Sequence, residues 1–519
     1  MADVVITRYR TGFRLQTTDA YLRNALTALH ETLTRPKIER SRGRVYAVPG
    51  DKFYIESEKE SAYYYIDALY DHVIQFIRNT QLRRNYPEYT IDVTEVILKE
   101  RGTVLFDAHR LDLVEPEDSN FFYQNAVIDY ALTPGRKNLI LELPPGVGKT
   151  IMSMKIAIRK QKRVLVITKA AYVEKWVGDL KDDLKLKPGE LVKIKGADEL
   201  QDMIDIGRAG RMDAMNKGDV QVKAMVISSH AVDKYLDNFF KYDGVECHPS
   251  EILEAMDVGL VIYDESHQLF RMNYWSYVML NIPDVIDLSA TLVPDDVFLK
   301  ARYLERFPAI DRYDKLVFEK YIEAMGIMYG IDDDRLIRSV NSMSLYNHMA
   351  FEGKLLKSKK MQKNYFAMCD SVLSKLYFKD YQPGQKALIF FATQQMCTEF
   401  ADYMQKRYPK HVVKRYIQGD KYNDMQTGDI IVSTPGKSGT AVDIKGLVIS
   451  LSTVMIDDTQ ANIQMLGRTR KARQWDIDVR MVYMFCRSIR KHMRYHEKRT
   501  KMYKGKVKSH MILNSSFMI

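Results

Sequence analysis

The chain has 519 residues, of which 46% are hydrophobic and 28% are charged, and its formal net charge is +11. This composition is ordinary for a soluble globular protein, the length predicts about three domains, and the absence of any run of 18 apolar residues excludes a membrane-spanning helix. The excess of Lys and Arg favours a polyanionic partner such as nucleic acid over a merely basic enzyme, although charge alone leaves both open.

The cysteines are few and scattered, with no Cys-x-x-Cys pair: Cys247, Cys369, Cys397 and Cys486. This spacing argues against a disulfide framework or a zinc module and fits a reducing compartment. The first residues lack the apolar region of a secretory signal. We therefore expect a cytoplasmic protein, in a bacterial or phage-infected cell, or a protein of another reducing intracellular compartment.

Residues 1–112 have the pattern of a small α+β domain. Leucines 22, 26, 29 and 33 recur at helical spacing after Thr18-Asp19, and residues 61–79 predict a second helix. Between these helices, residues 44–56 predict two short strands joined by a turn at Pro49-Gly50-Asp51. A nearby cluster of cations could grip phosphates or could be a solvated turn: Arg35, Lys37, Arg40, Arg42 and Arg44.

Two later stretches alternate short β-rich runs with helical patterns. The first covers residues 113–297, with runs such as NLILELP, RVLVITK and GLVIYDE. The second covers residues 385–519, with KALIFFAT, DIIVSTP and VRMVYMF, and ends in a basic segment. Residues 298–384 predict a helical connection and the start of the second stretch. Alternation of this kind is typical of βαβ units around buried parallel strands, so we expect two α/β lobes.

A phosphate-binding loop is indicated at residues 141–150, LELPPGVGKT. An apolar strand runs into a Gly-rich loop ending in Gly-Lys-Thr, and a helical pattern follows. Gly146 and Gly148 would let backbone N–H groups face inward at a helix N-terminus and form an anion cradle. Lys149 could then reach the terminal phosphates of a nucleotide, and Thr150 could place its hydroxyl on Mg²⁺.

Two adjacent carboxylates follow an apolar strand some hundred residues later, in the segment GLVIYDESH. In P-loop ATPases an Asp at a strand end helps to hold Mg²⁺, which is the role expected for Asp264. Glu265 is then placed to orient or deprotonate the attacking water. Together with the loop, this pair predicts an enzyme that hydrolyses ATP with Mg²⁺.

The ordered set of motifs resembles superfamily 2 helicases of the DEAH-like kind. In chain order, FYQ (122–124) is similar to the glutamine motif, LPPGVGKT to motif I, VLVITKAAYVEKW (164–176) to Ia, VISSHA (226–231) to Ib, DESH (264–267) to II, SAT (289–291) to III, ALIFFAT (387–393) to IV, STPGKSGTAVDI (433–444) to V, and QMLGRTRKAR (464–473) to VI. The resemblance spans both α/β stretches. It implies two tandem RecA-like P-loop lobes with parallel sheets, which clamp ATP between them and follow a small α+β N-terminal domain.

The same resemblance assigns roles to individual residues. It implies catalytic roles for Lys149, Asp264, Glu265, Gln464, Arg468 and Arg470; ATP contacts by Gln124, Pro145, Gly146, Val147, Gly148, Lys149, Thr150, Gly439 and Asp443; coupling by His267, Ser289 and Thr291; nucleic-acid contacts by Thr168, Lys169, Ser229, Thr393 and Thr434; and Mg²⁺ ligands in Thr150 and Asp264. The family pattern has its second arginine finger where this chain has Lys471. We favour Arg470 for that role because a planar guanidinium suits phosphate oxygens better than an ammonium.

The layout of a small N-terminal unit and two short lobes is similar to phage UvsW-type, RecG-like branch-migration helicases. This likeness implies a monomeric DNA helicase or translocase that acts on forks, junctions or R-loops in replication, recombination or repair. An RNA-directed or transcription-associated motor is the main alternative. A scaffold without turnover is disfavoured because Lys149, Asp264, Glu265 and Arg468 are all present, and an unrelated P-loop NTPase leaves the second lobe unexplained.

Overall fold

The computed structural model describes residues 2–41, 44–84, 88–106, 114–119, 121–143, 147–212, 220–242, 245–290, 292, 294, 296–313, 320–343, 346–420, 422–438, 444–469, 471–475 and 477–519. Backbone packing divides the chain into two compact units, the first ending at residue 317 and the second beginning at residue 318. Among the described residues, no helix combines the length and the apolar character that crossing a membrane would require.

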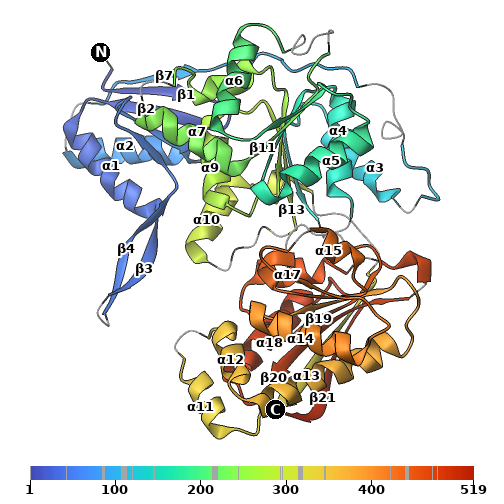
Figure 1. The fold of residues 1–519 in the computed structure, drawn as a ribbon. Helices are drawn as coiled ribbons and strands as arrows, with labels where there is room; N and C mark the ends of the chain where they lie inside the picture. The colour runs from blue at the N-terminus through green and yellow to red at the C-terminus, as the bar shows by residue number, and fades with distance from the viewer. Residues whose placement is uncertain are drawn as a thin grey trace. The chain divides into compact units, whose positions relative to one another are not determined.

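The N-terminal part of the first unit is a five-stranded mixed sheet with the strand order β5-β6-β2-β1-β7 (Figure 1). Strands β1 and β7 are parallel, and the other neighbours are antiparallel. Its elements are β1 (Val4–Arg8), β2 (Gly12–Thr17), α1 (Ala20–Thr32), β5 (Ile55–Ser57), β6 (Ala62–Ile66), α2 (Tyr70–Arg84) and β7 (Ile91–Glu95). Asp19 caps α1 by accepting a hydrogen bond from the backbone N–H of Leu22 at 2.6 Å, as the sequence pattern predicted.

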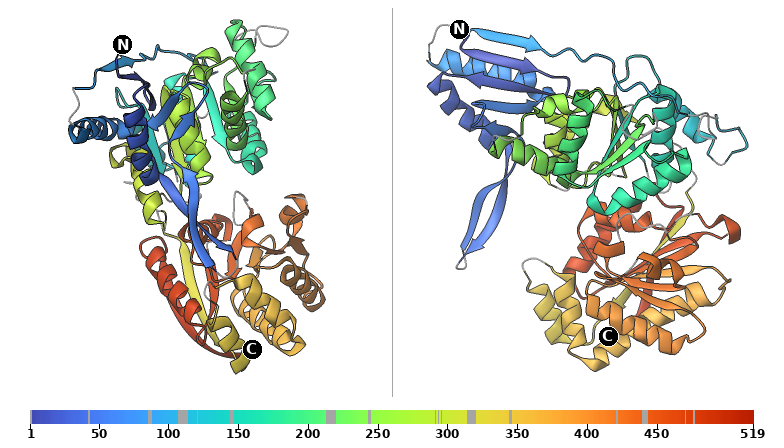
Figure 2. Two further views of the ribbon diagram at one scale, coloured as in Figure 1. Left: turned by 90° about the vertical axis from the view of Figure 1, so that its left-hand side faces the viewer. Right: turned by 45° about the horizontal axis from the view of Figure 1, so that its top comes forward.

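A separate two-stranded hairpin, β3 (Thr34–Ser41) with β4 (Arg44–Lys52), extends from this part of the first unit (Figures 1 and 2). The prediction of a turn at Pro49-Gly50-Asp51 was wrong, because these residues lie inside β4. Pro49 is tolerated there because it faces Pro36 across an irregular register, where neither residue has an N–H to contribute. Gly50 is also required, since a Cβ on it would lie 2.6 Å from the backbone oxygen of Arg35.

The rest of the first unit is a seven-stranded sheet in which every pairing is parallel, with the order β10-β11-β9-β12-β13-β8-β14. Figure 1 shows α4 and α5 on one face of this sheet and α7 and α9 on the other. The elements are α3 (Tyr123–Ala131), β8 (Asn138–Glu142), α4 (Lys149–Lys160), β9 (Val164–Thr168), α5 (Val173–Leu184), β10 (Leu191–Ile194), α6 (Ala197–Arg208), β11 (Ala224–Ser228), α7 (Ser229–Lys241), α8 (Ile252–Ala255), β12 (Leu260–Asp264), α9 (Phe270–Met279), β13 (Asp284–Ser289), α10 (Val297–Arg306) and β14 (Arg312–Tyr313).

The N-terminal sheet and this parallel sheet share one continuous hydrophobic core. Helix α9 packs against both β2 and β6. Phe53 is 1% exposed, and its ring lies within 5.1–5.7 Å of the rings of Phe270, Tyr274 and Phe298. The indole N–H of Trp275 donates to the backbone oxygen of Lys52 at 2.9 Å. The N-terminal part is therefore packed onto the parallel sheet as one body.

Two arginines add polar links across the same junction. Arg10 donates to Asn138 Oδ1 at 2.8 Å and also to the backbone oxygen of Ile282. Arg35, at the base of the β3–β4 hairpin, pairs with Asp296 at 2.7 Å, and Asp296 caps α10. Because the hairpin base is held to α10, the hairpin is anchored to the parallel-sheet lobe as well as to the N-terminal sheet.

The second unit is another seven-stranded, wholly parallel sheet, with the order β17-β18-β16-β19-β20-β15-β21. Its elements are β15 (Ile322–Gly330), α11 (Asp334–Asn341), α12 (His348–Leu356), α13 (Lys359–Leu373), β16 (Lys386–Phe390), α14 (Gln394–Arg407), β17 (Val413–Tyr416), α15 (Tyr422–Thr427), β18 (Ile430–Ser433), α16 (Pro435–Ser438), β19 (Leu447–Ser452), α17 (Thr459–Leu466), β20 (Val479–Cys486), α18 (Arg490–Tyr503) and β21 (Ser509–Met518).

The two parallel sheets have the same topology. When the strands are counted from the first strand of each sheet, both orders read 3-4-2-5-6-1-7. This confirms the predicted fold class of two tandem RecA-like α/β lobes after a small α+β domain. Within residues 298–384, which the sequence indicated as a mainly helical connection, the structure also has strands in both sheets, β14 in the first and β15 in the second.

Candidate nucleotide site

The phosphate-binding loop lies where β8 leads into α4. The helix begins at Lys149, and its N-cap Gly148 has a left-handed φ of 81°, a conformation that glycine adopts without strain. The ammonium of Lys149 donates to the backbone oxygen of Leu143 at 2.8 Å, across the base of the loop. Thr150 is in the first turn of α4. A lysine and a hydroxyl are thus presented at a helix N-terminus, where anions bind favourably.

Helix α3 packs directly against this loop. Tyr123 donates to the backbone oxygen of Val147 at 2.8 Å, and the amide of Gln124 donates to the same oxygen at 3.4 Å. Gln124 is 2% exposed, and a Cβ on Gly148 would lie 2.6 Å from its Nε2. Its Oε1 is buried with no hydrogen-bond partner among the described residues. The adenine contact of Gln124 stays a prediction, whereas the structure shows directly that Gln124 contacts the loop.

Asp264 ends β12 at the carboxyl edge of the sheet, the edge at which open parallel sheets bind ligands. Its Oδ2 accepts a hydrogen bond from the indole N–H of Trp176 at 2.7 Å and a longer one from Thr168 at 3.4 Å. Burial raises the pKa of this carboxyl, the neighbouring charge of Glu265 raises it further, and the Trp176 hydrogen bond opposes the rise. A cation placed here would relieve the electrostatic strain.

Glu265 is held in an unusual conformation. Its φ is +47°, in the left-handed region that non-glycine residues seldom adopt. Such strain persists only where the surroundings impose it, and it often marks functional sites. One carboxylate oxygen, Oε2, is buried and lies 3.5 Å from His267 Nδ1 but makes no hydrogen bond among the described residues, although the side chain as a whole is 25% exposed. An acceptor in this state is available for a water or a metal-bound ligand.

The structure brings His267 and Ser289 together. The imidazole Nδ1 of His267 and the hydroxyl of Ser289 are 2.8 Å apart, and both residues are buried. Ser289 ends β13, the strand next to both β8 and β12, and its backbone oxygen accepts from the N–H of Leu143 at 3.1 Å. The segment after β12 is thereby linked through β13 to the phosphate loop, although this contact does not test the predicted coupling role.

The residues predicted to contact nucleic acid in the first unit differ in exposure. Thr168 is 0% and Ser229 is 3% exposed. The Ser229 hydroxyl donates to Asn273 Oδ1 at 2.8 Å, and the Thr168 hydroxyl is directed to Asp264. Lys169 is half-buried and lies over the ring of Tyr172. In this structure, therefore, the lysine is the group of the three that solvent reaches most easily.

In the second unit, Thr393 caps α14 and is held by a buried carboxylate. Both the N–H and the hydroxyl of Thr393 donate to Glu352 Oε2, at 2.7 and 2.8 Å, and Ala392 N–H donates to Oε1 at 2.7 Å. Glu352 is 0% exposed, and burial raises its pKa to about 7. The hydroxyl that the sequence assigned to a phosphate contact is engaged within the protein.

The remaining predicted residues of the second unit lie on two segments. Thr434 follows β18, and Gln464 lies on α17. Arg468 follows the end of that helix, with its backbone N–H bonded to the oxygen of Met465 at 3.2 Å. Six other predicted residues lie outside the described residues: Pro145, Gly146, Thr291, Gly439, Asp443 and Arg470.

Sequence reasoning missed two contacts in these sites. Trp176 and Glu352 hold a predicted site residue each, yet they lie 88 and 41 positions away from it in the chain. Trp176 falls within the segment that resembles motif Ia, so a lone tryptophan in that helix was a usable signal. Nothing in the local pattern distinguishes Glu352 from a surface glutamate on an amphipathic helix.

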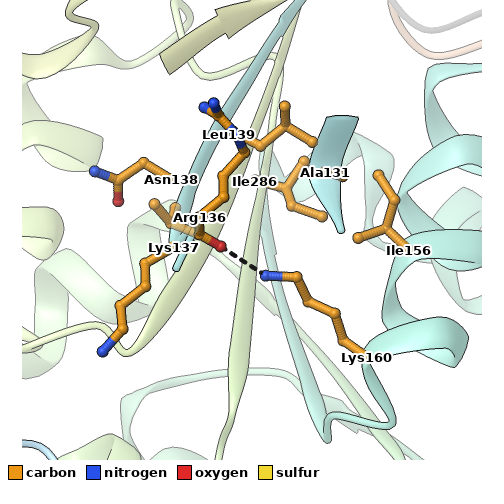
Figure 3. Close-up of a pocket in the computed structure, with 9 residues that line it drawn as sticks. Ala131, Arg136, Lys137, Asn138, Leu139, Ile156, Lys160 and Ile286 are labelled. Carbon is orange, nitrogen blue, oxygen red and sulfur yellow. Dashed lines mark hydrogen bonds between the residues drawn. The ribbon is translucent and has the colours of Figure 1, made fainter. Parts of the chain in front are cut away.

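A small cavity lies at the other end of α4 from the loop (Figure 3). It measures about 10 Å³ and is lined by residues that include Arg136, Leu139 and Lys160. Lys160 closes it by donating to the backbone oxygen of Arg136 at 3.0 Å and by pairing with Asp284 at 2.7 Å. A volume of this size holds about one water, so it is not a nucleotide pocket.

The donor set at the loop fits a magnesium nucleotide. Among the described residues, no group of three or more His, Cys, Asp or Glu side chains could hold a metal ion by itself. Mg²⁺ commonly keeps several waters and takes one or two carboxylates together with substrate phosphates. Thr150 and Asp264 are the residues that would hold the ion, which would supply neutralising charge to the phosphates.

Comparison with known families decides the class of this lobe. Residues 117–293 match the family model described as "Type III restriction enzyme, res subunit". The matched segment contains the phosphate loop, the Asp264-Glu265 pair and Ser289. Residues 117–293 are therefore similar to a superfamily 2 motor lobe. The resemblance stated from the sequence is thereby confirmed for the part of the chain that carries motifs I to III.

Three solved structures are similar to this chain at low sequence identity. S. cerevisiae Dbp5 bound to RNA and ADP BeF3 has a TM-score of 0.46 and 10% identity, covering 76% of this chain and 89% of that one. Mss116p bound to ssRNA and AMP-PNP has a TM-score of 0.46 and 13% identity, covering 77% of this chain and 78% of that one. T4 UvsW has a TM-score of 0.31 and 12% identity, covering 99% of each chain. A search of curated proteins found no match.

Proposed function

We propose that the chain is an ATP-dependent DNA helicase or translocase that remodels branched DNA such as forks, junctions and R-loops, with roles in replication, recombination or repair. The observation that carries the ATPase part is the arrangement of Lys149, Asp264 and Glu265 at the carboxyl edge of one parallel sheet, within a superfamily 2 motor lobe. The net charge of +11 supports a nucleic-acid partner.

Under this proposal each group of the site has a defined task. Lys149 binds the terminal phosphates, and Thr150 and Asp264 hold Mg²⁺. Glu265 accepts a proton from the attacking water through its buried Oε2, which lies 3.5 Å from His267 Nδ1. Arg468 stabilises charge on the transferred phosphoryl group, with Arg470 as its second cation. Thr168, Lys169, Ser229, Thr393 and Thr434 line the path of a strand, with Lys169 and backbone N–H groups as the direct contacts.

The N-terminal domain is proposed as a further nucleic-acid contact. The β3–β4 hairpin carries most of the cations of the basic cluster, and phosphate contacts position a duplex without reading its sequence. The four cysteines are buried and free, which supports a reducing compartment. We further propose that the protein acts as a monomer in the cytoplasm of a bacterial or phage-infected cell.

The test is stimulation of ATP hydrolysis by a panel of forked DNA, four-way junctions, linear duplex, single-stranded DNA and RNA at one salt concentration. We expect branched DNA to stimulate most, Lys149→Ala to abolish turnover while most of the DNA affinity is kept, and Glu265→Gln to bind ATP without hydrolysing it. Stronger stimulation by RNA than by any DNA would replace the proposal with an RNA-directed motor. Normal turnover in the Lys149 variant would refute the site.

A further inference from the structure

Helix α17 carries Gln464 and leads into Arg468, and a single buried cation from another helix holds its start. Arg499 lies on α18 and is 0% exposed. Its Nε donates to Asn462 Oδ1 at 2.8 Å, and its Nη2 donates to the backbone oxygen of Val454 at 3.2 Å. One guanidinium thus bridges the end of the β19 segment and the body of α17.

Asn462 passes this restraint to the first turn of the helix. It is 0% exposed, and its amide donates to the backbone oxygens of Asp458 at 2.7 Å and Ile456 at 3.2 Å. Asp458 in turn caps α17 by accepting from Ala461 N–H at 2.6 Å. The residues before α17 and its first turn are therefore fixed by a chain of hydrogen bonds that ends at Arg499.

The charge of Arg499 is not balanced in the usual way. Within the described part of the second unit, no carboxylate pairs with it; the guanidinium also lies 3.6 Å from the Met455 sulfur, 4.7 Å from the Tyr483 ring and near Tyr503. Burial lowers the pKa of His348 and His492, and the positive charge of Arg499 contributes to both shifts. The surrounding imidazoles are thus held neutral and supply no second charge.

An unpaired buried cation is a poor way to gain stability, because its desolvation offsets what its hydrogen bonds contribute. An apolar residue of similar volume would fill the same space at less cost. A guanidinium is favoured where a fixed, planar set of donors must define a geometry. The position that this set defines is that of α17.

We infer that Arg499 is a positioning residue that acts through Asn462 to set the place of α17, and with it Gln464 and Arg468, for ATP hydrolysis. This inference rests on the proposed function. Arg499 touches neither nucleotide nor nucleic acid in this scheme. A displacement of about 1 Å in catalytic groups can cost 10²-fold in rate, so its loss should appear in turnover.

The test compares full-length Arg499→Met, Asn462→Ala and the double variant, with Tyr503→Phe as the matched control. Tyr503 is buried on the same helix, and its hydroxyl has no hydrogen-bond partner among the described residues. We expect kcat for nucleic-acid-stimulated ATP hydrolysis to fall about 100-fold in Arg499→Met. The KM for ATP should stay within about threefold, the double variant should be no worse than the worse single one, and the control should be unchanged.

In the stability and kinetic assays, either of two results would overturn the inference: a lower Tm with unchanged kcat per folded molecule, or losses of kcat that multiply in the double variant. Hydrogen exchange gives a readout that does not need turnover. Amides of residues 463–469 should exchange at least tenfold faster in Arg499→Met and not in Tyr503→Phe. If the wild-type chain hydrolyses no ATP, the proposed function fails, whereas unchanged protection of α17 in the variant refutes the positioning role itself.

Discussion

Replacing Phe53 with alanine should destabilise the whole first unit and not only its N-terminal sheet. Phe53 is 1% exposed and packs against Phe270, Tyr274 and Phe298 of the motor lobe. Truncating a buried phenylalanine costs about 3–5 kcal/mol, counting both the lost transfer energy and the cavity. That is a large share of the total stability of a folded domain, which is about 5–15 kcal/mol.

The assay is urea unfolding followed by tryptophan fluorescence in a Trp475→Phe background. The chain has three tryptophans, so this background keeps Trp176 beside Asp264 and Trp275 at the junction with Lys52. With an m-value of about 3 kcal/mol/M, the midpoint should fall by about 1 M or more. Leu82→Ala on α2, where the side chain is 73% exposed, is the matched control.

The reasoning is refuted if Phe53→Ala costs less than about 1 kcal/mol, a value more typical of an exposed site. It is also refuted if two separate transitions appear, because a shared core requires the N-terminal sheet and the motor lobe to unfold together. Either result would mean that the N-terminal domain is an independent attachment and that it could be deleted without loss of the motor.

Gly148→Ala should weaken ATP binding at least tenfold, measured by titration with a fluorescent nucleotide, because its φ is +81° and its new Cβ would lie 2.6 Å from Gln124. Trp176→Phe should move the acid limb of the pH profile of kcat/KM for ATP hydrolysis to higher pH, since the hydrogen bond that it removes lowers the pKa of Asp264. His348→Gln should flatten the pH dependence of stability below pH 6.5. Burial lowers the folded-state pKa of His348 to about 3, so this residue takes up a proton on unfolding. Its contribution lowers the free energy of unfolding of the wild-type chain by up to about 1.4 kcal/mol per pH unit as the pH falls.

Each of these has its own contrary result. Unchanged nucleotide affinity in Gly148→Ala would mean that Gln124 moves aside without penalty. An unmoved acid limb in Trp176→Phe would show that the group seen in the pH profile is not Asp264. For His348, equal urea midpoints of wild type and variant from pH 7 to pH 4, relative to their values at pH 7, would contradict the linkage; His72→Gln, exposed on α2, is the control.

The sequence predicted the motor lobe well because its signals are local. The phosphate loop and the Asp264-Glu265 pair each follow an apolar strand, and in a parallel sheet all strands end at the same edge, so their proximity follows from the strand pattern. Strand β15 was not recognised because its sequence, IEAMGIMYG, contains Gly, Ala and Met between its Ile and Tyr residues. Gly, Ala and Met do not favour a strand.

Contacts between distant segments could not be read in this way. Phe53 and Trp275 look like ordinary apolar residues in their own segments. Nothing in the local sequence shows that Phe53 packs against α9, the helix that carries Trp275. Arg499 lies in the basic C-terminal segment among many cations, and only the fold shows that this side chain points inward. Side chains that hold site residues in place were missed for the same reason.

The β3–β4 hairpin is fastened at its base by the pair between Arg35 and Asp296, and Asp296 also caps α10 of the motor lobe. A hairpin held in this way at its base is not joined to the lobe by a flexible hinge. If the first unit moves during ATP turnover, this pair makes the base of the hairpin move with α10.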